Sequence, residues 1–437
     1  MSRFIRANLA TFTWLPAEAV AHAFGERYDL PLPLHLWLAA AGLTVALSFV
    51  VFALALRRGA SYRQFFLLRI PPPLVGALRA VSVGVFVVLI AGGLLGTQDP
   101  FRNLAPAFVW IAWWIGFTYL TALVGDLWSV LNPWKVVYSK GLFKLPPAVE
   151  AWPAVALLLA FAWIEIVWEG NAVPANIAWL ALGYSLLTWT GMFVFGREAW
   201  LKSGEVFTVY FGFIARLAPI EWRTNGELHL RAPAAGLLDP RPLSSSEAFF
   251  VIVMLALVTF DGLRETPLWA VSDAHWTAAT TAGLLALPFL FALVIFGICA
   301  SMSSAPAGEL LRLFVPTLLP IALAYHVAHY LSYLLIAGQV VIPLASDPFG
   351  RGWNLFGTAH YQIAVGIVGA RFAWYTSVIV IVAGHVLAMY VAHRLALALF
   401  SERRTARRSQ YPLAALMVAY TMLSLWILAQ PIVETVK

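Results

Sequence analysis

The stretch VPTLLPIALAYHVAHYLSYLLIAGQ, residues 315–339, is long and apolar enough to cross a lipid bilayer as a single helix. His326 and His329 lie near its middle, three residues apart, so a helix places both imidazoles on one face, with Tyr333 one turn further on. Polar side chains at bilayer depth are costly unless they face a protein interior, a water-filled cavity or a metal ion. The stretch therefore predicts a helix that contributes a polar site to the inside of a helical bundle.

Similar apolar runs recur along the chain, which has 437 residues, of which 61% are hydrophobic and 11% charged. Such a composition is too apolar for a soluble core, and each run is long enough to cross the hydrocarbon layer of about 30 Å. The sequence thus predicts an all-α fold, a polytopic transmembrane helical bundle of about ten spans. The expected spans are residues 34–56, 74–95, 107–131, 152–168, 177–195, 248–260, 277–300, 316–339, 372–397 and 412–428.

Charged residues predict how this bundle is oriented. The net charge is +7, and the basic residues fall almost wholly in alternate loops, which are therefore cytoplasmic by the positive-inside rule, with both termini outside. Because the orientation of the bundle explains these basic residues, they do not indicate nucleic-acid binding. The lipid bilayer is the predicted partner, and the sequence does not identify protein partners. The single cysteine, Cys299, excludes a disulfide framework and a cysteine-based metal site within the chain.

Three regions follow from these patterns. Residues 1–32 are predicted to be an interfacial or extramembrane lead-in, residues 33–431 the transmembrane bundle, and residues 432–437 a short outer tail. Residues 198–217 are apolar but carry Lys202, Glu205 and Arg216, so an interfacial or re-entrant helix is expected there.

Three histidines and one aspartate are the candidate metal ligands. His326 and His329 on span eight and His385 on span nine are expected at one depth, with Asp261 of span six toward the same outer half. Imidazole and carboxylate ligands suit zinc, iron or copper. A metal ion bound there would lower the pKa of a coordinated water and supply hydroxide near neutral pH.

Other charged residues complete the predicted site. Glu165 and Glu169, near the outer end of span four, are candidates for a fourth ligand or a general base. Arg264 becomes an anion clamp if the segment TFDGLRETPLW, residues 259–269, folds back over the site.

Alternative roles remain open for the same residues. They could serve as interhelical hydrogen-bond partners or proton relays. His385 with His326 or His329 could instead hold a haem b in a membrane redox subunit. A transporter is a third possibility, supported by the interrupted segments 197–220 and 259–269.

Several separated stretches carry a resemblance to a known family: YDLPLPLHLW (28–37), GDLWSVLNPWKVVY (125–138), TFDGLRETPLW (259–269), IALAYHVAHYLSYLLIAGQ (321–339), SDPFGRGWNLFGTA (346–359) and GHVLAMYVAHRLAL (384–397). In these stretches the chain resembles, nearly end to end, the bacterial integral-membrane family named fenitrothion hydrolase. The resemblance implies a protein of the bacterial inner membrane that hydrolyses an apolar organophosphorus triester at its P–O–aryl bond. A metal-bound hydroxide attacking phosphorus would fit that reaction.

Overall fold

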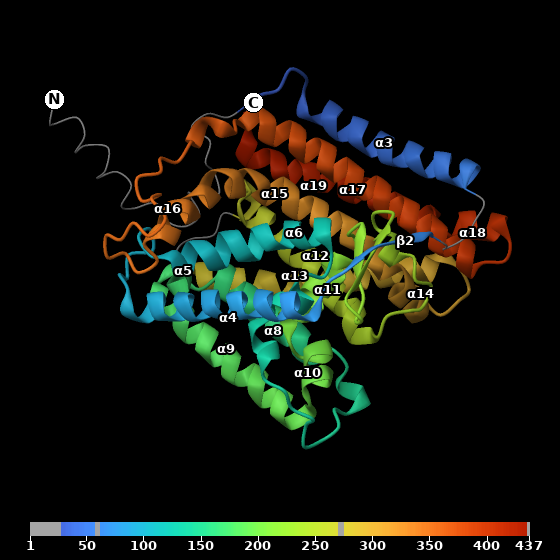
Figure 1. The fold of residues 1–437 in the computed structure, drawn as a ribbon. Coiled ribbons are helices and arrows are strands. Elements are labelled where there is room, and N and C mark those ends of the chain that lie inside the picture. The colour runs from blue at the N-terminus through green and yellow to red at the C-terminus, as the bar shows by residue number, and fades with distance from the viewer. Residues whose placement is uncertain (1–27, 57–61, 270–274, 435–437) are drawn as a thin grey trace.

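The computed structural model describes residues 28–56, 62–269 and 275–434, and helices make up most of it (Figure 1). Ten helical segments in these ranges are long and apolar enough to cross a membrane: Leu34–Ala55, Pro72–Leu95, Leu104–Val124, Pro147–Ile166, Pro174–Phe195, Ser245–Arg264, Trp276–Met302, Ala307–Ser346, Ala370–Leu399 and Arg403–Gln430. The predicted all-α polytopic bundle is thereby confirmed. Residues 1–27 of the expected lead-in and 435–437 of the expected tail lie outside the described residues.

Some of these segments comprise several elements. The third contains α5 (Leu104–Pro106), the π-helix η1 (Ala107–Phe117) and α6 (Thr118–Val124), whereas the eighth contains α14 (Ala307–Phe314), η8 (Val315–Leu318), α15 (Leu319–Ala337), η9 (Gly338–Val340) and α16 (Val341–Ser346). The fourth contains η3 (Pro147–Val149) and α8 (Trp152–Ile166), and the tenth contains α18 (Arg403–Ser409) and most of α19 (Tyr411–Ile432). The other six are α3 (Leu34–Ala55), α4 (Pro72–Leu95), α9 (Pro174–Phe195), α12 (Ser245–Arg264), α13 (Trp276–Met302) and α17 (Ala370–Leu399).

Helix α12 is the central helix of the bundle. Fifteen of its 20 residues are buried, and it packs against α8, α13, α15 and α19. It begins with a capping box, in which the Ser244 hydroxyl accepts from the Glu247 amide at 3.2 Å and the Glu247 carboxylate accepts from the Ser244 amide at 2.9 Å. Its buried polar residues therefore face protein on every side.

Helices α15 and α17 approach closely because small residues line their contact. A Cβ added to Gly384 of α17 would lie 2.4 Å from the Ala324 Cβ and 2.8 Å from the Pro320 carbonyl oxygen of α15. The Ser377 hydroxyl also donates to the Ala328 carbonyl oxygen at 3.2 Å. Small residues at such contacts let helix backbones approach closely inside a membrane.

The third span ends earlier than the hydropathy pattern predicts. Helix α6 ends at Val124 because Gly125 adopts φ 90°, a conformation that favours glycine, whereas the apolar pattern extends to residue 131. A Cβ at Gly125 would also lie 2.3 Å from the carbonyl oxygen of Ile220. A short antiparallel sheet in the order β2 (Gln64–Arg69), β4 (Glu227–Arg231), β3 (Ile220–Trp222) packs at this point.

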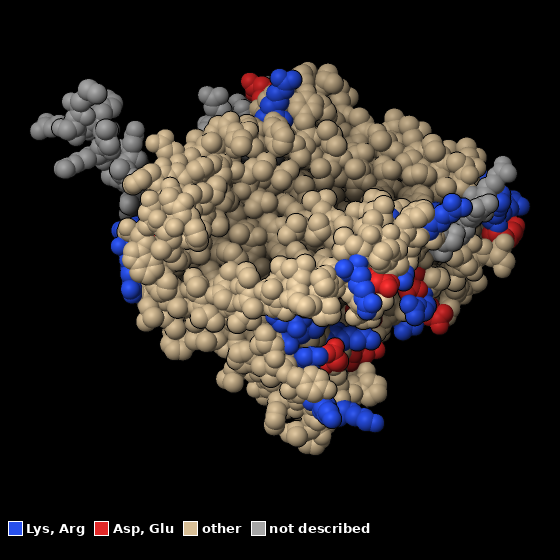
Figure 2. All heavy atoms as spheres, in the orientation of Figure 1, with Lys and Arg blue, Asp and Glu red and all other residues tan. Residues whose placement is uncertain are grey.

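The segment expected as an interfacial or re-entrant helix folds as α10 (Arg197–Ser203) and α11 (Val206–Ala215). Eight of the ten α11 residues are buried, so α11 lies inside the bundle. The end of the bundle that carries α10, α14, α18 and the β2–β4 sheet is called the basic end, because most Lys and Arg atoms visible in Figure 2 gather there.

The close α15–α17 contact gives a test of this packing. Gly384→Ala should lower the unfolding free energy of the detergent-purified protein by about 1–3 kcal/mol, and its melting temperature with it. The reason is that the added methyl group meets backbone and a neighbouring Cβ. Gly297→Ala in α13 is the matched control, since nothing lies within 4 Å of the added carbon. Equal melting temperatures for the two variants would contradict the packing described.

Candidate functional site

The candidate site is centred on the Asp261 carboxylate, near the C-terminal end of α12. Its Oδ1 accepts from Arg264 Nε at 2.7 Å, and its Oδ2 accepts from His329 Nε2 at 3.0 Å and from the Tyr330 hydroxyl. The side chains of Asp261 and His329 are only 6% and 7% exposed. A buried carboxylate is tolerated under such conditions, because a cation and two further donors surround it.

The helices position these groups by simple periodicity. Asp261 and Arg264 are three residues apart on α12, so they share one face, and α15 packs against that helix with His329 and Tyr330. The sequence predicted Asp261 and His329 for one site, and the structure brings this pair together. Helices α8, α12, α15 and α17, which the predicted site required to be neighbours, form a connected series of contacts.

His326, one turn before His329, makes different contacts. The Tyr119 hydroxyl of α6 donates to the His326 carbonyl oxygen at 2.9 Å and lies 3.3 Å from His326 Nδ1. Because the single hydroxyl proton is used on the carbonyl, Nδ1 donates and Nε2 carries the lone pair. That buried Nε2 has no hydrogen-bond partner among the described residues.

His385 lies apart from this pair. Its Nδ1 donates to the Ile381 carbonyl oxygen of its own helix at 2.8 Å, and its ring centroid is 5.8 Å from that of Tyr420 of α19. Its buried Nε2 also lacks a partner among the described residues. No hydrogen bond described in the structure joins His385 to Asp261, His326 or His329.

The other charged residues of the predicted site also differ in where they lie relative to Asp261. Glu165 lies on α8, which packs against α12, the helix that carries Asp261 and Arg264. Glu169 is exposed in the short helix η4 (Glu169–Ala172). Arg264 donates to the Asp261 carboxylate, and its role as an anion clamp stays a prediction.

The predicted metal ligands can be compared with what a metal ion requires. In the described parts of the chain, no three His, Cys, Asp or Glu side chains form a group that could hold a metal ion. Asp261 and His329 direct their nearest ligating atoms at each other, whereas His326 and His385 each retain an unpartnered Nε2. The four residues as arranged therefore do not fit one shared ion, and metal or haem binding by the histidines stays a prediction.

Two polar residues of importance were not predicted from the sequence. Tyr330 donates to Asp261, although the helical spacing from His326 and His329 points to Tyr333. Glu205, fully buried at the start of α11, accepts from Tyr184 at 2.7 Å, Asn132 at 3.0 Å and the Thr208 amide at 2.8 Å. The sequence predicted Glu205 at a membrane interface, so its role as a buried hydrogen-bond acceptor was not expected.

Comparisons with known proteins do not assign the chain to a family. No protein-family model matches it, and comparisons with curated proteins and with solved structures found no match either. The resemblance to fenitrothion hydrolase therefore stays a prediction.

The Asp261 contacts predict a stability effect. Asp261→Asn removes the carboxylate to which Arg264, His329 and Tyr330 donate, and should lower the unfolding free energy by about 3 kcal/mol or more. Thermal unfolding in detergent would measure the loss. The exposed Glu169→Gln change is the control and should have almost no effect; an equally small effect at Asp261 would show that the cluster does not stabilise the bundle.

Proposed function

We propose that the protein is a membrane-embedded hydrolase of apolar organophosphorus triesters, with the Asp261–His329 pair as its general base. The hydrogen bond of 3.0 Å between Asp261 Oδ2 and His329 Nε2 carries this proposal. A carboxylate that accepts from one imidazole nitrogen orients the ring and stabilises the imidazolium that forms when the other nitrogen takes a proton. The resemblance of the sequence to fenitrothion hydrolase supports the choice of substrate.

The reaction uses the second nitrogen of His329. Among the described residues, Nδ1 makes no hydrogen bond, so a water molecule can donate to it. Nδ1 accepts the proton while the water oxygen bonds to phosphorus, the P–O–aryl bond breaks, and the aryloxide leaves with the electron pair. A nitrophenolate is a stable leaving group, so no strong acid is needed to protonate it.

The surroundings of His329 support access for a substrate. The residues that follow His329 on α15, 330–335, are all partly exposed, whereas most of α15 before His329 is buried. Figure 2 shows a hollow between α4 and the α17–α19 side, over α6 and α15. An apolar triester dissolved in the bilayer could approach the cluster through such a hollow.

Hydrolysis is tested with a dialkyl 4-nitrophenyl phosphate and the protein in lipid nanodiscs. The wild type should release nitrophenolate, and His329→Ala should lower kcat by about 10²–10⁴-fold because the general base is lost. His326→Ala is the matched variant one turn away and should retain activity within a few-fold. Melting temperatures of all three proteins show that they are folded.

Four outcomes would contradict this proposal. Unchanged turnover in folded His329→Ala would show that His329 is not the general base. Absence of turnover in the wild type would show that the protein is not a hydrolase of this substrate. Equal losses in His326→Ala and His329→Ala, together with loss of bound zinc, copper or iron, would favour the metal site predicted from the sequence. A Soret band in the purified wild type would favour the haem-bearing redox subunit.

Proton-coupled transport is a second candidate. It is favoured by the continuous hydrogen bonding from Tyr330 through Asp261 to His329. Substrate-dependent acidification of proteoliposomes without nitrophenolate release would select it.

We further propose that the protein lies in the bacterial cytoplasmic membrane with its basic end inside and both termini outside. The concentration of Lys and Arg at that end supports this orientation (Figure 2). Cys299 is buried, so a single added cysteine can report on each end. Arg404→Cys, exposed on α18, should react with a membrane-impermeant maleimide only after the cells are opened, whereas Gln362→Cys should react in intact cells. The reverse pattern would invert the topology.

A further inference from the structure

A large apolar cavity lies between α4 and α9, on a part of the bundle that the proposed hydrolytic reaction does not use. Its volume is about 730 Å³, and α8, η1 and α11 contribute to its wall. The lining is mostly aliphatic and aromatic, with Val85, Phe86, Trp113, Trp134 and Phe207 among its residues. Cavities of this size and composition hold drug-sized or lipid-like molecules.

The cavity opens sideways because α4 and α9 diverge. They touch where a Cβ added to Gly93 would lie 2.6 Å from the Pro174 carbonyl oxygen, and they separate toward the basic end (Figure 1). Val81 of α4 and Leu187 of α9 line the cavity and are 65% and 42% exposed. Since both helices are apolar enough to span the membrane, the opening faces lipid chains.

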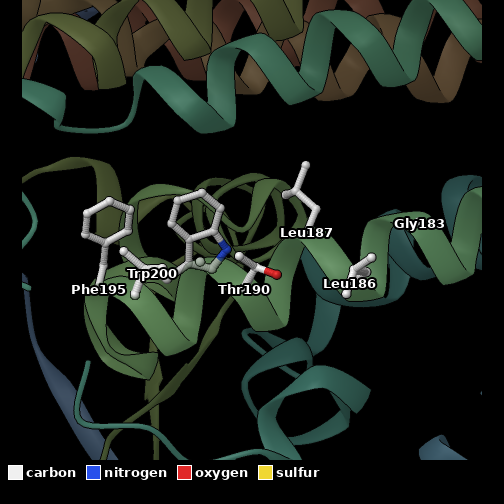
Figure 3. Close-up of a pocket in the computed structure, with 8 residues that line it drawn as sticks. Gly183, Leu186, Leu187, Thr190, Phe195 and Trp200 are labelled. Carbon is white, nitrogen blue, oxygen red and sulfur yellow. The ribbon is translucent and has the colours of Figure 1, made fainter. Parts of the chain in front are cut away.

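A second groove of about 430 Å³ adjoins the cavity and shares Gly183 and Leu187 with it. Figure 3 shows the ring of Phe195, the last residue of α9, beside the ring of Trp200 of α10 in this groove. The ring centroids are 6.1 Å apart, and the ring planes are nearly parallel. Apolar surface thus continues around α9, which suits an extended hydrocarbon chain better than a compact solute.

Cations flank the cavity at its basic end. Arg79 follows the lining residue Leu78, and Lys135 follows the lining residue Trp134. Arg79 Nε donates to the Val130 carbonyl oxygen at 3.3 Å, and Lys135 Nζ donates to the Ser129 carbonyl oxygen at 2.9 Å. Among the described residues, neither forms an ion pair with a carboxylate.

The charges around Lys135 leave a net attraction for an anion. Two cations, Lys135 and the nearby Arg79, face one neighbouring acid, Asp126. Glu198, the other nearby acid, is paired with Arg197 at 2.8 Å. The cations therefore lack full compensation, and a phosphate group would supply it.

We propose that this cavity binds an anionic phospholipid, with its acyl chains against the aromatic lining and its phosphate at Arg79 and Lys135. The length of α4 agrees with this placement. Arg79 lies seven residues from the start of the helix, about 10 Å along its axis, within reach of the phosphate level of the bilayer. The inference stands independently of the hydrolase.

Native mass spectrometry and thermal unfolding of the detergent-purified protein test this site. Palmitoyl-oleoyl-phosphatidylglycerol should bind the wild type at least tenfold more tightly than the phosphatidylcholine with the same chains, and should raise its melting temperature more. The double variant Arg79→Gln/Lys135→Gln should lose that preference, since each cation contributes attraction to an anionic headgroup. Arg404→Gln, exposed on α18, is the matched control and should retain it.

Two further measurements distinguish a bound phospholipid from a bound inorganic anion. Ala160→Phe places a ring in the cavity and should weaken binding of both lipids while leaving the cations in place. Phosphatidylglycerol preference that survives in the double variant would overturn the proposal. So would an equal rise in melting temperature with inorganic phosphate alone, because that result would assign an ion site without a chain.

Discussion

The buried charge of Asp261 constrains the helices around it. Arg264 neutralises the carboxylate from the same helix, so α12 carries a balanced pair that does not depend on its neighbours. His329 and Tyr330 then donate to Oδ2 from α15. Because consecutive helical residues differ in direction by about 100°, both can reach one oxygen only if α15 presents the edge between them. That requirement fixes the register of α15, and the absence of a side chain at Gly262 leaves room for Tyr325 beside the cluster.

Two buried carboxylates in this bundle illustrate how structural and chemical roles differ. Glu205 is surrounded by neutral donors from the indole, amide, phenol, hydroxyl and backbone groups near it, and it caps the N-terminus of α11, where the helix dipole favours a negative charge. Its contacts all stabilise one local fold. Asp261 instead accepts from an imidazole, a group that can exchange protons near neutral pH. The partner, more than the burial, therefore separates a carboxylate that fixes a fold from one that can take part in acid–base chemistry.

Hydropathy and charge predicted the ten spans because each span must be long and apolar, and a sequence displays length and polarity directly. The same patterns could not show which way a side chain points, since helices that are apolar all round give no preferred face. The expected depth in the membrane therefore grouped His385 with His326 and His329, whereas the His385 side chain points toward Tyr420. Tyr330 was missed for the same reason, as it lies about 100° from His329. The end of α6 was misplaced because the conformation of Gly125 depends on a strand almost 100 residues later, which local sequence does not contain.

Hydrogen bonding also distinguishes histidines that depth alone treats as equivalent. At His326 and His385 the oxygen partners lie on Nδ1, which leaves the lone pair on a buried Nε2. At His329 the carboxylate partner lies on Nε2, which leaves Nδ1 to accept a proton. A carbonyl or hydroxyl oxygen orients a ring without supplying negative charge, whereas the Asp261 carboxylate also stabilises the imidazolium. Of these three imidazoles, His329 is therefore the one whose surroundings favour both proton uptake and a fixed orientation, and this asymmetry makes it the general base of the proposed reaction.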